Sequence, residues 1–104
     1  MIKVLEYVTS DGKAPLSEWL KKLNKKDRGR VRVRLNRIRL GNFGDCEPVG
    51  EGVQELRFFF GSGYRVYFGR KGDTIVILLS GGNKSSQKKD IKKARQYWRD
   101  YKNE

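Results

Sequence analysis

One acidic and three basic residues in the second half of the chain have side chains suited to chemistry on a phosphate group. Glu55 and Arg57 lie in the segment VQELRFFF, Arg65 lies in GSGYRVYF, and Lys84 follows the apolar run TIVILL. Guanidinium groups are planar, multidentate donors to phosphate, and an ammonium group is a compact charge. Chemistry on a phosphate group needs such cations, a proton acceptor and a proton donor. Glu55, Arg57, Arg65 and Lys84 are therefore candidate catalytic residues for such chemistry.

The alternation of side chains along a strand indicates which of these residues share a face of a sheet. If the apolar neighbours of Arg65 face the core, Arg65 faces the other side. Burying Leu56 on the preceding strand leaves Glu55 and Arg57 on the face of Arg65. We expect these three side chains to form a polar cluster on the open side of the sheet, with Glu55 either as the general base or as the salt-bridge partner that positions Arg57.

Positive charge is concentrated in two blocks of the sequence. The chain carries 24 Lys and Arg against 12 Asp and Glu, a net charge of +12, and the surplus lies in residues 21–39 and 84–104. A basic surface of this kind attracts nucleic acid, acidic lipid or an acidic protein, and it is also compatible with a merely well-solvated surface. The candidate RNA-binding residues in these blocks are Arg32, Arg39, Gln87, Lys88 and Lys92.

Hydrophobic periodicity and turn residues predict a single α+β domain over residues 1–104. The turns that separate the last three strands are short enough only for antiparallel hairpins. The last strand is apolar on both faces, which favours a central position covered by helices. The predicted order is β-α-α-β-β-β-α, an antiparallel sheet with a helical hairpin and a C-terminal helix: a strand over 2–8, a helix from Pro15, a second helix that ends at Gly41, a loop over 41–52, strands over 53–60, 64–70 and 74–80, and a final helix.

The composition argues against several other classes of protein. The longest apolar run, TIVILL, is far shorter than the roughly 20 residues of a membrane helix. A single cysteine, Cys46, cannot form an internal disulfide, so we expect a soluble, cytoplasmic protein. The chain has no histidine and no carboxylate cluster at ligand spacing, and neither GSG nor SGG fits a phosphate-binding loop. We expect no metal, no cofactor and no membrane partner.

The segments ELRFFFGSGYRVYF and IVILLSGGNKSSQKKDIKKARQYW, preceded by two helical patterns, resemble the RelE/ParE superfamily of toxins from type II toxin–antitoxin systems. The resemblance covers nearly the whole chain and points to the HigB-like addiction module killer branch. It implies a compact fold similar to that of microbial ribonucleases. It also implies that Arg65 corresponds to the arginine of the family's GYR motif, Arg57 to the basic position on the preceding strand, and Lys84 to the basic residue of the loop after the last strand.

The same resemblance implies a function. Many such toxins bind the ribosomal A site and cut mRNA there without a metal, and an antitoxin neutralises them. We therefore expect a ribosome-dependent endoribonuclease that inhibits translation, with the ribosome, mRNA and an acidic antitoxin as partners. Many relatives also use a histidine or tyrosine near the C-terminus, whereas this chain has no histidine and carries Tyr97 and Tyr101 well inside the last helix. The alternatives are a non-enzymatic ParE-like inhibitor of DNA gyrase and a nucleic-acid-binding module without cleavage.

Overall fold

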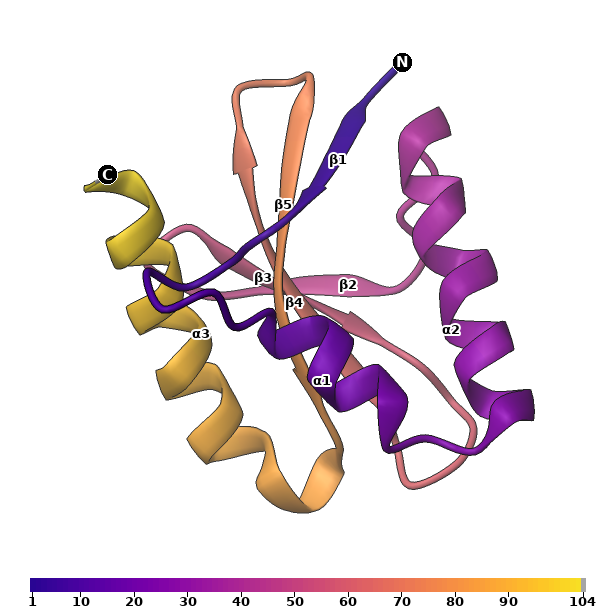
Figure 1. Ribbon diagram of the computed structural model, residues 1–104. Helices are drawn as coiled ribbons and strands as arrows, with labels where there is room; N and C mark the ends of the chain where they lie inside the picture. The colour runs from indigo at the N-terminus through magenta and orange to yellow at the C-terminus, as the bar shows by residue number, and fades with distance from the viewer. Residues whose placement is uncertain (104) are drawn as a thin grey trace.

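The computed structural model describes residues 1–103 and consists of one five-stranded sheet with helices on both faces (Figure 1). The strand order is β1-β5-β4-β3-β2. β1 is parallel to β5, and every other neighbouring pair is antiparallel. The elements are β1 (Lys3–Glu6), α1 (Pro15–Lys21), α2 (Lys25–Arg37), β2 (Cys46–Gly50), β3 (Val53–Arg57), β4 (Arg65–Lys71), β5 (Ile75–Gly82) and α3 (Gln87–Lys102), with short 3-10 turns at Ile38–Leu40 and Lys84–Ser86.

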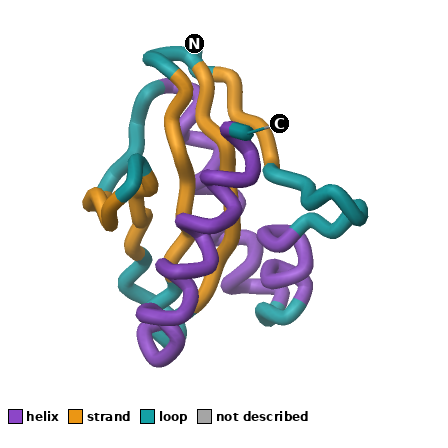
Figure 2. Tube along the Cα trace, turned by 90° about the vertical axis from the view of Figure 1, so that its left-hand side faces the viewer, coloured by secondary structure: helices purple, strands orange, loops and turns teal. Residues whose placement is uncertain are grey.

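The helices form two hydrophobic layers against the sheet. Leu16 and Leu20 of α1 and Val31 and Leu35 of α2 belong to the core on one face. The other face is covered by α3, which lies along the strands in Figure 2 and contributes buried residues of its own. Each helix buries one stripe of apolar residues, as amphipathic helices do, and exposes most of its basic residues. None of the helices within residues 1–103 is long and apolar enough to cross a membrane.

The predicted α+β fold and the central position of the last strand are confirmed. β5 lies between β1 and β4. Its residues Val76 and Leu78 face the core under α1 and α2, and Ile77 and Leu79 face the core under α3. A strand buried on both faces needs apolar residues at consecutive positions, which is what TIVILL provides.

Two features of the sheet differ from the prediction. The segment 41–52, expected to be a loop, contains the edge strand β2, which pairs with β3 through a turn that includes Glu51 at a φ of 56°. β2 is mostly exposed and contains Pro48, so it lacks the apolar alternation that identifies a strand. The first strand is parallel to β5, and the sheet is therefore not wholly antiparallel. Short turns determine only that β3, β4 and β5 are antiparallel. They do not determine the direction of β1, because α1 and α2 separate it from the other strands.

Two glycines on the sheet set how closely the helices approach it. A Cβ atom at Gly69 would lie 2.5 Å from the ring of Trp98 on α3, and one at Gly81 would overlap the ring of Trp19 on α1. Real Cβ atoms do not approach other atoms this closely. The two indole rings therefore rest directly on the backbone of the sheet, and any side chain at either glycine would push a helix away.

We expect Gly69→Ala to lower the free energy of unfolding by about 1–3 kcal/mol, because the added methyl group overpacks the contact with Trp98. The matched control is Gly29→Ala on α2, where nothing lies within 4 Å of the new Cβ atom. That control should raise the free energy of unfolding by about 0.5–1 kcal/mol, because glycine is unfavourable inside a helix. Urea unfolding measures both. Equal stability of Gly69→Ala and the wild type would contradict the packing described.

Candidate active site

A buried carboxylate joins β3, β4 and α3. The Glu55 side chain on β3 is only 2% exposed. Its Oε2 atom accepts a hydrogen bond of 2.9 Å from Nε2 of Gln87, in the first turn of α3, and lies 3.6 Å from Nε of Arg65 on β4. A carboxylate withdrawn from water needs such partners, because an unpaired buried charge is strongly destabilising. We call Glu55, Arg65 and Gln87 the buried cluster.

The shared face of Glu55, Arg57 and Arg65 is the one expected from alternation, but it is not open. The register pairs Arg57 with Arg65, and Glu55 with Tyr67, so the four residues lie on one side of the sheet. Ala94 and other residues of α3 pack against that same side. The expectation of a solvated cluster is therefore wrong, because the apolar stripe of α3 covers this face and brings Gln87 over Glu55.

Lys84 lies beside the buried cluster and remains accessible. Nη1 of Arg65 donates a hydrogen bond of 2.7 Å to the carbonyl oxygen of Gly63. A Cβ atom at Gly63 would lie 3.3 Å from that same nitrogen and 3.2 Å from Cβ of Lys84, so the two cationic residues flank one glycine. The backbone N–H of Lys84 donates to the carbonyl of Ser62, while its side chain is exposed. Arg65 and Lys84 thus lie beside one another at Gly63, where the side chain of Lys84 is exposed.

Arg57 is held by Asp45, just before β2, and by Glu47 of β2, and not by Glu55. Its Nε and Nη2 atoms each donate a hydrogen bond of 3.1 Å to a different oxygen of Asp45, and Nη2 lies 2.8 Å from Oε1 of Glu47. The hydrogen bonds that Arg57 donates to Asp45, followed by the attraction of both carboxylates, raise the pKa of the Arg57 guanidinium. Glu55 therefore does not serve as the salt-bridge partner of Arg57, one of the two roles considered for it. Arg57 and Arg65 face each other across the strands, and each turns to its own acid.

Asp45 and Glu47 were not found from the sequence, although a signal for them exists. The two acids are spaced two residues apart, and this spacing puts them on one face once the segment is recognised as a strand. The missing information was the presence of β2, because its exposed residues and its proline resemble those of a loop.

The candidate RNA-binding residues fall into three separate places. Gln87 is used within the buried cluster. Lys88 and Lys92 are exposed on α3. Arg32 and Arg39 line a shallow groove beside β1, together with residues of α1, on the opposite side of the sheet. The structure therefore does not bring Arg32 or Arg39 to the buried cluster.

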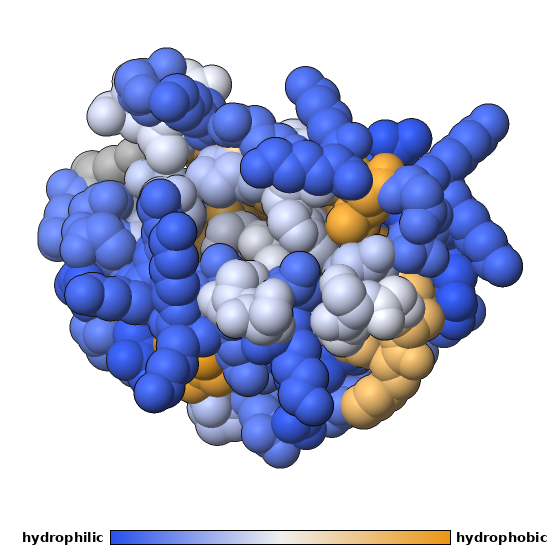
Figure 3. Space-filling view, turned by 90° about the horizontal axis from the view of Figure 1, so that it is seen from below, coloured by the Kyte–Doolittle hydropathy of each residue, from blue (hydrophilic) through white to orange (hydrophobic). Residues whose placement is uncertain are grey.

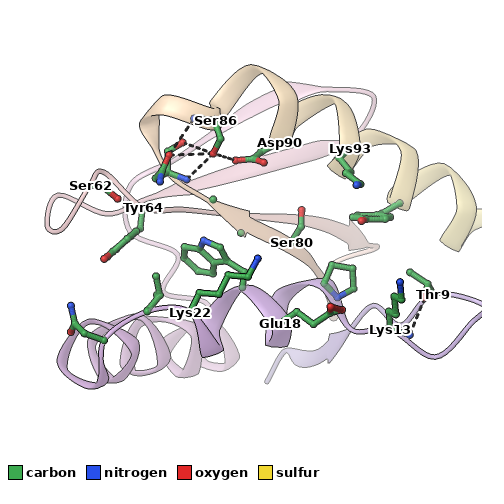
Figure 4. A pocket seen from close by; sticks show the side chains of 18 residues that line it. Thr9, Lys13, Glu18, Lys22, Ser62, Tyr64, Ser80, Ser86, Asp90 and Lys93 are labelled. Atoms are coloured by element: carbon green, nitrogen blue, oxygen red, sulfur yellow. Dashed lines mark hydrogen bonds between the residues drawn. The ribbon is translucent and has the colours of Figure 1, made fainter.

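A larger groove, of about 900 Å³, lies between α1 and α3 with the end of β5 as its floor. Figure 3 shows this end of the molecule, and Figure 4 shows Lys22 and Lys93 on opposite walls of the groove. The hydroxyl of Ser80 is buried in the floor without a hydrogen-bond partner among residues 1–103. None of the four candidate catalytic residues lines the groove. We place the candidate active site where the buried cluster meets the exposed Lys84, because two cationic residues flank one glycine there.

Comparison with known proteins gives two matches. A family model described as "Phage derived protein Gp49-like (DUF891)" matches residues 18–99. A protein of Haemophilus influenzae (strain ATCC 51907 / DSM 11121 / KW20 / Rd), described as an uncharacterized protein, is 47% identical over 78 residues, which cover 74% of this chain and 79% of that protein. The region matched by the family model contains Glu55, Arg57, Arg65 and Lys84.

Tyr67, which lies opposite Glu55 across β3 and β4, makes the stability of the fold depend on pH. Burial and the nearby charge of Glu55 raise its pKa, and its hydroxyl has no hydrogen-bond partner among residues 1–103. A tyrosine whose pKa is raised by folding contributes stability that is complete below about pH 10 and is lost as the pH rises further. We expect Tyr67→Phe to be at least as stable as the wild type at pH 7, because it removes an unpaired buried hydroxyl, and to lose less stability between pH 9 and 11. Urea unfolding at each pH tests this, and identical pH slopes would contradict it.

Proposed function

The chain belongs to the phage-derived Gp49-like family, a toxin-like family associated with toxin–antitoxin modules, and from this we propose that it is a HigB-like toxin that cleaves mRNA on the ribosome. The α+β fold fits the RelE/ParE superfamily broadly. The observation that carries the proposal is the placement of Arg65, oriented by a buried carboxylate, beside the accessible Lys84.

In this proposal, Arg65 and Lys84 bind the phosphate that is cut. The 2′-hydroxyl of the RNA loses its proton as its oxygen attacks the adjacent phosphorus, which forms a 2′,3′-cyclic phosphate. The bond between phosphorus and the 5′-oxygen breaks as that oxygen takes up a proton. Negative charge develops on the phosphoryl oxygens during this step, and fixed cations lower the barrier most when they are already oriented toward it. Arg65 meets that condition, since its side chain is only 13% exposed and is held by Glu55 and the carbonyl of Gly63.

We assign Glu55 and Gln87 to positioning. Glu55 is buried, and its Oε2 atom is already engaged by Gln87 and Arg65. A group in this position acts on the substrate through the arginine that it orients. Gln87 links the pair to α3, so the direction of the Arg65 guanidinium depends on the docking of that helix. Arg57, neutralised by Asp45 and Glu47, contributes a paired charge at the edge of the site.

The proposed protein partner is an antitoxin with an acidic segment. Association with toxin–antitoxin modules supports such a partner, and a net charge of +12 favours an acidic one. The accessible Lys84, Lys88 and Lys92 lie on or just before α3, where an acidic segment would block phosphate from reaching Arg65.

We expect brief expression of the protein in bacteria to produce new mRNA 5′ ends within translated frames. Arg65→Ala and Lys84→Ala should each remove most of these ends, because the loss of one oriented donor typically lowers a rate on the order of 10²- to 10³-fold. The matched control is Lys71→Ala, an exposed lysine at the end of β4 opposite Arg65, which should cleave mRNA as the wild type does. Mapping of mRNA 5′ ends across the transcriptome measures all four proteins.

Arg65→Ala leaves Glu55 buried without its cation, so its folding must be verified by circular dichroism. Lys84→Ala needs no such precaution, because the side chain is exposed. Arrested growth without new 5′ ends would overturn the nuclease proposal, and a DNA supercoiling assay would then test inhibition of gyrase. Unchanged cleavage by both variants would overturn the assignment of the site.

A further inference from the structure

A phenylalanine is fully presented to water at the turn between β3 and β4. Phe59 is 84% exposed, whereas its neighbour Phe58 is 4% exposed and Phe60 is half-buried. A large aromatic ring in water gains nothing for folding, since its apolar surface stays hydrated. An aromatic residue in this position is more typical of a contact with a ligand or partner.

Arginines from α2 surround this turn. The guanidinium carbon of Arg30 lies 3.8 Å from the centre of the Phe60 ring, and that of Arg34 lies 4.5 Å from the centre of the Phe58 ring. The guanidinium donors of Arg34 are already used within the protein, because they bond to the backbone carbonyls of Phe43, Asp45 and Arg57. Stacked guanidinium groups keep their charge and present a planar surface next to the aromatic rings.

The arginines and the turn enclose a small cleft, which we call the Arg–Phe cleft. Its volume is about 390 Å³, and no acidic side chain of residues 1–103 lines it. Arg30 and Arg37 form no salt bridge with an acid within that same range, so their charges are available to a ligand. The lining residues are Arg30, Val33, Arg34 and Arg37 of α2 and the run Phe58–Phe60.

This cleft divides the basic block of α2 into two surfaces. Arg30, Val33, Arg34 and Arg37 are spaced three and four residues apart, which puts them on one side of the helix. Arg32 and Arg39 line the separate groove beside β1. The cleft therefore uses basic residues other than those expected from the sequence to bind RNA, and it combines them with an exposed ring.

We propose that the Arg–Phe cleft binds an unpaired segment of RNA, with a base stacked on Phe59 and phosphates bound by Arg30 and Arg37. Base stacking on one aromatic ring next to cations is how proteins bind single strands without reading their sequence. Within residues 1–103, the large apolar residues exposed in the cleft are Phe59 and Val33. This is too little for the apolar centre of a stable protein interface, which buries roughly 800 Å² on each partner.

The location of the cleft is compatible with the proposed cleavage but does not depend on it. Phe59 follows Arg57 by two residues along the chain, and Arg34 donates to the carbonyl oxygen of Arg57. The cleft and Lys84 contact the same turn, since the backbone N–H of Lys84 donates to the carbonyl oxygen of Ser62. The binding itself needs no chemistry at the buried cluster, so it can be measured with a variant that lacks the cation at position 84.

The test uses the full chain carrying Lys84→Ala and a fluorescently labelled 12-nucleotide oligouridine, with affinity measured by anisotropy at several salt concentrations. We expect Phe59→Ala to weaken binding about tenfold, the effect of losing one stacked base, without changing the salt dependence. Arg30→Ala with Arg37→Ala should reduce the slope of log affinity against log salt by about 0.7 for each phosphate that is no longer bound. The matched control is Leu40→Ala, which removes another exposed apolar side chain, 75% exposed and outside the cleft, and should bind as the parent does.

A blunt RNA duplex of the same length separates stacking from simple charge attraction. Its bases are already stacked within the helix, so Phe59→Ala should not weaken duplex binding. Phe59 is exposed, and its truncation is not expected to disturb the fold. The proposal is overturned if Phe59→Ala binds oligouridine as tightly as the parent, or if it loses affinity equally for both RNAs. An effect of Phe59→Ala on an acidic protein partner alone would also overturn it.

Discussion

The Glu55 carboxylate lies inside the protein between Arg65 and Gln87, and the arrangement of three elements depends on this contact. A buried carboxylate without partners would cost several kcal/mol. β3 and β4 must therefore keep their register, because a shift by one residue would turn Arg65 to the other face. α3 must also begin where it does, since Gln87 stands in its first turn. The contact that stabilises the docking of α3 is thus the one that orients the candidate catalytic arginine.

The basic residues of the chain divide into those with an acidic partner and those without one. Arg57 is paired with two acids at the start of β2, of which the first immediately precedes the strand. Arg99 on α3 is paired with Glu51, 2.7 Å away, in the turn after β2. Lys84 and Arg30 form no salt bridge within residues 1–103 and lie at the buried cluster and at the Arg–Phe cleft. Net charge alone therefore locates no RNA-binding surface. In the proposed function, acids neutralise some of the arginines and leave others available to phosphate.

The features that depend on neighbouring residues could be predicted from the sequence. Alternation along the strands correctly placed Glu55 and Arg65 on one face, and short turns correctly predicted the antiparallel pairing of β3, β4 and β5. It did not reveal that α3 covers this face, because an amphipathic pattern identifies the buried side of a helix but not the surface that it meets. The acids that pair with Arg57 could not be predicted either, because β2 positions them and its exposed edge residues resemble those of a loop. Both the position of α3 on the sheet and the partner of Arg57 depend on contacts between segments far apart in the sequence.

The most direct test of the central claim is a double-mutant cycle on the rate at which ribosome-bound mRNA is cut in a purified translation system, using Glu55→Gln, Arg65→Ala and the double variant. If Glu55 acts by orienting Arg65, Glu55→Gln should lower the cleavage rate of the otherwise wild-type protein. It should not lower the rate further in a protein that already carries Arg65→Ala. A full additional loss in the Arg65→Ala background would show that Glu55 acts on the substrate independently of Arg65. That result would contradict the account and return Glu55 to the role of general base.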